Sequence, residues 1–142
     1  MEKPIFKDNG DGTITDTAND LTWAREDSWQ KEAKWFTWDE ASDYAKDLAG
    51  IRFAGHYEWR LPTIVEAETL YELDKENKDK YGTKLFLDPI FPEGPLPTIW
   101  LHEPSMSGDD YILDLRNGEI RTLYKSKSGR MAARPVRKSY IE

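Results

Sequence analysis

The stretch of sequence that decides the fold is GHYEWRLPTIVEAETLYEL, residues 55–73. Thr63 and Glu66 stand three residues apart directly after Pro62, a spacing typical of a helix start in which each side chain caps the backbone of the other residue. The sequence therefore predicts a helix from Pro62 to about Leu73. Its apolar residues recur at helical spacing and are expected to face the core: Ile64, Ala67, Leu70 and Tyr71.

A second helix is predicted over FTWDEASDYAKDLAG, residues 36–50. Thr37 and Glu40 repeat the capping pattern, and Gly50 is a residue type that commonly ends helices. The apolar positions again recur at helical spacing, at Trp38, Ala41, Tyr44, Ala45, Leu48 and Ala49. Two helices, each with one buried face, are therefore expected.

Short β-prone segments lie before and after these helices. Residues 8–16, DNGDGTITD, contain two glycines between such segments and predict a tight hairpin. The alternative is a calcium loop, because three aspartates crowd together there. The spacing lacks the terminal glutamate of the twelve-residue calcium loop, so we favour the turn. Further strands are predicted at residues 21–23, 98–101, 111–115, 119–124 and 131–136.

Asn117-Gly118 is the strongest hairpin signal in the chain and lies between two of these strands. Residues 74–97 are charged and then rich in proline, so we expect them to cross the surface as a long irregular connection. The α+β class is indicated by this order of elements: a hairpin, two helices, a long loop and antiparallel strands. The 142 residues match the usual size of one domain, spanning 1–142.

The composition excludes several classes of protein. The formal net charge is -7, and nucleic acid and anionic membranes repel an acidic protein. No window approaches the roughly 18 apolar residues that span a bilayer, and the first residues lack the pattern of a signal peptide. Cysteine is absent, so disulfides, thiolate metal sites and cysteine nucleophiles are excluded. A basic strip at residues 121–138 could still hold a sulfate or carboxylate group.

The order of the motifs resembles that of a bacterial family, the one typified by the C-terminal domain of Legionella collagen-like proteins. The resemblance runs from about Phe6 to Arg137, nearly the whole chain. The segments that carry it are DNGDGTITDTANDLTW at 8–23, FTWDEASDYAKDLAG at 36–50, GHYEWRLPTIVEAETLYEL at 55–73, Ile99-Trp100, and ARPVR at 133–137. Its most specific parts are the glycine hairpin and the Trp59-Arg60-Leu61-Pro62 motif followed by a helix.

The resemblance implies a C-type lectin-like fold, related to that of formylglycine-generating enzymes and of the variable proteins of diversity-generating retroelements. In such a fold two helices accompany an antiparallel sheet, the terminal strands are adjacent, and an irregular loop region carries the recognition surface. We therefore expect the strand that begins near Ile5 to pair with the closing strand at 131–136. The resemblance also suggests an extracytoplasmic or cell-surface location.

The tryptophans divide into two groups. Trp59 and Leu61 are expected to anchor the core, and we favour a structural role for Arg60 between them over a carboxylate-binding one. Trp23, Trp38 and Trp100 also fall where the pattern requires core residues. Trp29 and Trp35 lie in a polar segment, and an exposed contact or packing under a loop explains them equally well.

A catalytic function is disfavoured by the residues that are missing. The resemblance to formylglycine-generating enzymes does not extend to their activity, because that activity relies on a cysteine pair. The related iron-dependent sulfur-transfer enzymes need a histidine cluster, whereas this chain has only His56 and His102. No segment resembles a nucleophile elbow. We expect no catalytic site, no cofactor and no required metal.

The candidate ligand-binding residues form two groups. The first lies in an irregular polar stretch after a predicted strand, and the second lies in the next turn. They are His102, Glu103, Ser105, Asp109, Asp110, Tyr111, Lys125, Lys127 and Arg130. We expect a recognition module that binds a glycan or a protein ligand. The alternatives are a structural or assembly domain of a surface or phage-related protein, an enzyme with an unrecognised site, and ordinary solvated loops. Homo-oligomerisation is left open.

Overall fold

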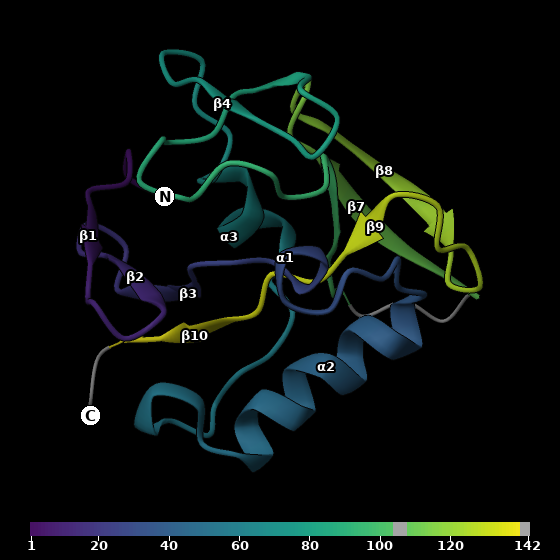
Figure 1. Ribbon diagram of the computed structural model, residues 1–142, viewed down its shortest axis with the longest axis horizontal. Coiled ribbons are helices and arrows are strands. Elements are labelled where there is room, and N and C mark those ends of the chain that lie inside the picture. Colours follow the sequence, from purple (N-terminus) through teal and green to yellow (C-terminus); the bar gives the residue numbers. More distant parts are fainter. Residues whose placement is uncertain (104–107, 140–142) are drawn as a thin grey trace.

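The computed structural model describes residues 1–103 and 108–139, and it has an α+β architecture with two four-stranded sheets (Figure 1). The first sheet contains β1 (Phe6–Asp8), β2 (Thr13–Asp16), β3 (Leu21–Ala24) and β10 (Val136–Lys138), in the order β1-β2-β3-β10. All its neighbouring strands are antiparallel. The expected hairpin at residues 8–16 is therefore confirmed as the β1–β2 connection.

The second sheet has the order β8-β7-β6-β9. Its strands are β6 (Thr98–Trp100), β7 (Asp109–Asp114), β8 (Glu119–Tyr124) and β9 (Met131–Ala132). The predicted Asn117-Gly118 turn joins β7 to β8, and Gly118 has the positive φ of 76° that such a turn requires. A two-stranded ribbon, β4 (Asn77–Lys78) with β5 (Lys84–Leu85), lies in the long connection.

Three α-helices are found among the described residues: α1 (Ser28–Glu32), α2 (Trp38–Gly50) and α3 (Ile64–Glu68); a short 3-10 turn, η1 (Phe53–Gly55), follows α2. Both predicted capping boxes are present, with Thr37 and Glu40 starting α2 and Thr63 and Glu66 starting α3. No helix in the described part of the chain combines the length and the apolar character that crossing a bilayer needs.

Two expectations about helices were wrong. The structure adds α1, which Asp27 caps: its side chain accepts a hydrogen bond from Gln30 N at 2.9 Å. In return, the Asp27 backbone N–H donates to the side-chain oxygen of Gln30. In addition, α3 ends at Glu68 rather than near Leu73. The Thr69 hydroxyl donates to the Glu66 carbonyl at 2.6 Å, and Glu72 N turns away to donate to Phe86 O. The chain therefore leaves the helix to pair with the long connection.

The expected pairing of the first and last strands was also wrong. The closing strand β10 pairs with β3, with Val136 opposite Trp23, while β1 pairs only with β2 within this sheet. The two terminal strands are thus the opposite edges of one sheet rather than neighbours. The predicted strand 131–136 is also split, because β9 pairs in parallel with β6 of the second sheet before the chain crosses to β3. Figure 1 shows this yellow segment running between the two sheets.

The central strands of the second sheet, β6 and β7, are buried on both faces, whereas the edge strand β8 is largely exposed. Ile99 and Leu113 lie opposite each other and belong to the first apolar cluster, to which α3 and the first sheet also contribute side chains. Trp100 and Ile112, the next pair along, belong to a second cluster with α2. Because successive residues of a strand point to opposite faces, the sheet separates two apolar layers.

The long connection at residues 74–97 does not simply cross the surface, contrary to expectation. Leu85, Leu87, Phe91 and Leu96 are fully buried in the structure. Asn77 is also buried, and its amide donates to the carbonyl of Phe91 at 2.8 Å. Widely spaced apolar side chains thus anchor an irregular backbone to the core, a pattern without the periodicity that marks helices and strands.

We predict that Leu87→Ala lowers the free energy of unfolding by about 2–5 kcal/mol, because it opens a cavity in a close-packed core. Leu73→Ala makes the same chemical change at a side chain that is 76% exposed, and we expect its effect to stay within about 0.5 kcal/mol. Urea unfolding of both variants measures the difference. Equal small effects would mean that the connection is not part of the core.

Candidate functional site

The predicted ligand-binding residues come from two parts of the chain, the ends of β6 and β7 and the turn after β8. His102 and Glu103 follow β6, Asp109 and Asp110 begin β7 with Tyr111, and Ser105 lies outside the described residues. The backbone N–H of Lys125 donates to Gly108 O at 3.0 Å. This bond places the turn after β8 next to the start of β7.

Asp110 and Glu103 hold this loop in place. Asp110 is buried, and its Oδ1 accepts from Glu103 N at 3.2 Å and from Tyr111 N at 2.8 Å. Glu103 Oε1 accepts from Ile64 N, the first residue of α3, at 2.7 Å. Both carboxylates therefore bond backbone N–H groups within the fold. Tyr111 is half-buried and packs against the first apolar cluster.

His102 remains exposed and lies over an aromatic pocket. Its Nδ1 is 3.3 Å from Asp110 Oδ2, and its ring centroid is 5.5 Å from that of Trp38. The pocket has a volume of about 460 Å³ and lies between α2 and residues 59–63. Besides these two rings its lining includes Ser42, Lys46, Trp59, Arg60 and Thr63. Of the predicted site residues that the structure describes, only His102 lines it.

Trp38 is the pocket residue that the sequence reasoning misplaced. It is half-buried rather than a core residue, and its indole Nε1 donates to Leu101 O at 3.0 Å. The Lys125 ammonium lies 4.3 Å from its ring centroid, so one predicted cation contacts this ring, although Lys125 does not line the pocket. Trp38 is the first residue of α2, and the helical period alone could not show that its ring is only partly buried.

Arg60 is held by an ion pair at the pocket wall, in agreement with the structural role expected for it. Its guanidinium donates to both oxygens of Glu66 at 2.7 Å, and its backbone exchanges hydrogen bonds with Val136. Burial raises the pKa of Glu66, but the bonds from Arg60 and from Thr63 N outweigh it and leave that pKa below its ordinary 4.5. The carboxylate therefore stays ionised and fixes the arginine.

Lys127 and Arg130 line a separate basic hollow of about 330 Å³, together with Arg116 and Arg121. Arg116 donates to Asp114 at 3.0 and 2.8 Å. Burial raises the pKa of Asp114, yet the bonds from Arg116 more than offset this and lower it overall. The predicted basic strip is thus divided, because Arg134 and Arg137 are buried.

Trp29 and Trp35 are both at least partly accessible. Trp35 is 45% exposed. Trp29 belongs to α1, and the ammonium of Lys80 lies 4.3 Å from its ring centroid. Neither lines the aromatic pocket. Trp35 therefore offers a matched control for substitutions of Trp38.

We predict that Glu66→Gln lowers the free energy of unfolding by about 1–2 kcal/mol at pH 7, since a charge-assisted pair with a partly exposed arginine is lost. The folded-state pKa of Glu66 is depressed, so its stabilisation is present above pH 4.5 and is lost as the pH falls through the folded value. Urea unfolding at several pH values should show the two proteins converging in acid. The exposed Glu68→Gln is the control, and a loss that is independent of pH would contradict this account.

One comparison with known proteins identifies a family, and the other is negative. None of the curated proteins matches this chain. The family model described as the Lcl C-terminal domain matches residues 12–137, which include both sheets apart from the first strand and the last residue of β10. They also include every predicted site residue. The chain therefore belongs to the Lcl C-terminal domain family.

Proposed function

We propose that this domain is a non-catalytic recognition module that binds a glycan or a protein ligand through the loop region around His102. The observation that carries the proposal is the aromatic pocket, where the rings of Trp38 and His102 meet at 5.5 Å beside polar side chains. Pockets of this size with a few convergent polar groups are the usual form of a small-ligand site.

The chemistry of the pocket favours a sugar ring. Aromatic faces pack against apolar C–H surfaces, and hydroxyl, ammonium and guanidinium groups satisfy a ligand's oxygens. Ser42, Lys46 and Thr63 supply such groups around Trp38. Because Trp38 is fixed by its bond to Leu101 O, it needs little ordering when a ligand binds.

We also propose that the fold is C-type lectin-like. Membership of the family supports this, as does the presence of strands from both ends of the chain in one sheet, although the two terminal strands form its opposite edges. The segment between β6 and β7 would then correspond to the recognition loop. The family's extracytoplasmic or cell-surface location would provide the glycans or proteins that such a surface binds.

An acidic group on the ligand would find cations nearby. Lys46 lines the aromatic pocket and Lys125 contacts the ring of Trp38, while Lys127 and Arg130 line the basic hollow with two arginines. Charge-assisted hydrogen bonds to a carboxylate or sulfate are stronger than neutral ones. A structural or assembly domain remains the second hypothesis for the function. An enzyme is the third hypothesis, because a sequence without cysteine and with two histidines offers few catalytic side chains.

An array of purified glycans tests the proposal. We predict that Trp38→Ala weakens binding to the best glycan by about tenfold or more, as expected for a central aromatic contact. His102→Ala, at an exposed side chain, should weaken it as well and keeps the test valid if Trp38→Ala alters the melting temperature. Trp35→Ala is the control and should bind the glycan with the affinity of the wild-type protein.

Two outcomes would overturn the proposed site. Unchanged glycan affinity in folded Trp38→Ala and His102→Ala proteins would place recognition elsewhere. The absence of any glycan signal, together with a single protein partner that Trp38→Ala and His102→Ala still bind fully in a pull-down, would instead support the assembly hypothesis.

A further inference from the structure

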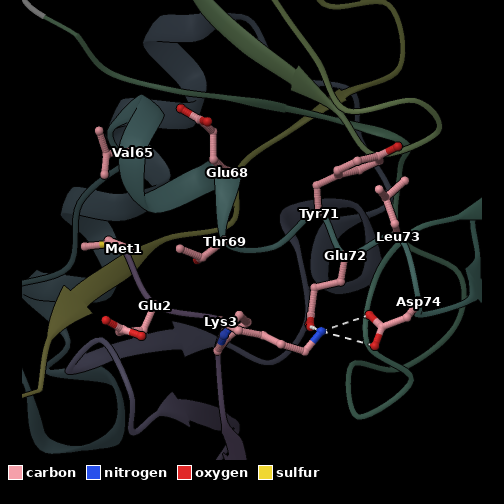
Figure 2. Close-up of a pocket in the computed structure, with 11 residues that line it drawn as sticks. Met1, Glu2, Lys3, Val65, Glu68, Thr69, Tyr71, Glu72, Leu73 and Asp74 are labelled. Atoms are coloured by element: carbon pink, nitrogen blue, oxygen red, sulfur yellow. Dashed lines mark hydrogen bonds and ion pairs between the residues drawn. The ribbon is translucent and has the colours of Figure 1, made fainter.

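A groove of about 760 Å³ lies on another part of the molecule, between the N-terminal residues 1–4 and α3 with the chain that follows it (Figure 2). Its lining side chains include four carboxylates and one ammonium: Glu2, Glu68, Glu72, Asp74 and Lys3. None of these residues belongs to the aromatic pocket or to the basic hollow. The groove therefore differs from the recognition site in both place and charge.

Hydrogen bonds fix the N-terminal wall of the groove. Glu2 N donates to Asn19 Oδ1 and Glu2 O accepts from Asn19 Nδ2, both at 2.9 Å. Ile5 N donates to Asp16 Oδ1 at 3.1 Å. The backbone of residues 2–5 is thus attached to the β2–β3 connection, and the groove is formed before any ligand arrives.

Glu72 is a buried carboxylate at the floor of this groove. Its side chain is only 5% exposed, and the Lys3 ammonium lies 3.2 Å from its Oε2 as an ion pair. No other donor within the described residues bonds either oxygen. Burial raises the pKa of Glu72, and the attraction of Lys3 opposes this only in part. A buried carboxylate with so few partners lacks the hydrogen-bond donors that water would supply.

Lys3 shows which ligand chemistry the groove accepts. Figure 2 shows Glu72 and Asp74 both approaching its ammonium, which donates to Asp74 at 3.0 and 3.1 Å. Yet the Lys3 side chain is 64% exposed, and exposed ion pairs contribute little free energy. An incoming cation can therefore replace it at a small cost.

The rest of the lining favours an organic cation over a metal ion. Within residues 1–103 and 108–139, no three His, Asp or Glu side chains are grouped as metal ligands. Val65 and Leu73 line the groove and are 55% and 76% exposed, which leaves apolar surface for methylene groups. An aliphatic chain that ends in an ammonium matches both features.

We propose that this groove binds the primary ammonium of an aliphatic amine, with Glu72 and Asp74 as acceptors and Lys3 as the internal group that the ligand displaces. The same chemistry occurs in free polyamines and in lysine side chains. The binding requires neither the aromatic pocket nor a glycan. It is thus a second binding site of the domain.

Titration of the full chain followed by NMR tests this site, with spermidine as one probe and N-acetyl-lysine N-methylamide as the other. The amides of residues 65–74 should shift on titration. We predict that Glu72→Gln weakens spermidine binding about tenfold or more, since a charge-assisted contact is lost. Glu119→Gln makes the same change in net charge on exposed β8 and should bind as the unchanged protein does. Lys3→Met should bind severalfold more tightly.

Each result bears on the inference. Tighter binding of spermidine than of the lysine derivative identifies polyamines as the source, and the reverse order identifies lysine side chains. Equal weakening by Glu72→Gln and Glu119→Gln would show attraction by net charge alone and would overturn the site. So would shifts confined to residues outside the groove, or no binding of either probe. Trp38→Ala should leave spermidine binding unchanged, which separates this test from that of the recognition site.

Discussion

The guanidinium of Arg134 lies fully buried where the two sheets, α1 and the long connection meet. Its Nη1 donates to the carbonyls of Ala24 and Arg25 at 2.9 and 2.7 Å, and its charge lies 4.9 Å from the ring centroid of Phe91. Burial lowers the pKa of Arg134 and raises that of Asp27, and each charge opposes the other's shift. Nε and Nη2 have no partner within the described residues. A buried cation is tolerated here because carbonyls, an aromatic face and an acid surround it.

This arginine lies in the middle of the segment that joins the sheets. On one side β9 pairs with β6, and on the other β10 pairs with β3. Val136 also exchanges hydrogen bonds of 2.8 and 3.1 Å with the backbone of Arg60. The closing segment therefore fixes residues 59–63, which form one wall of the aromatic pocket, while α2 forms the other. Asp27 extends the same network, since it caps α1 and accepts from Leu96 N of the long connection at 2.8 Å. The recognition surface that we propose depends on this junction although no ligand would touch it.

The features that could be predicted from the sequence are local ones. The capping boxes of α2 and α3 and the turn at Asn117-Gly118 depend on residues within four positions of each other, and the structure has all three. What the sequence could not show depends on distant partners. The split of the closing strand between two sheets, the burial of Leu87 and the exposure of the Trp38 ring are set by tertiary contacts, not by periodicity. For the same reason the loop prediction included Glu103 and Asp110, whose carboxylates instead bond backbone N–H groups.

The central claim is that the buried charge of Arg134 holds the closing segment, and with it both sheets, in place. Urea unfolding of Arg134→Met measured against Arg121→Met tests it most directly, because both variants lose one positive charge and Arg121 is exposed. We predict that Arg134→Met lowers the free energy of unfolding by about 3–5 kcal/mol, since Asp27 loses its buried counter-charge and two carbonyls lose a donor. Arg121→Met should change it by less than about 0.5 kcal/mol. Equal stabilities of the two variants would contradict the account.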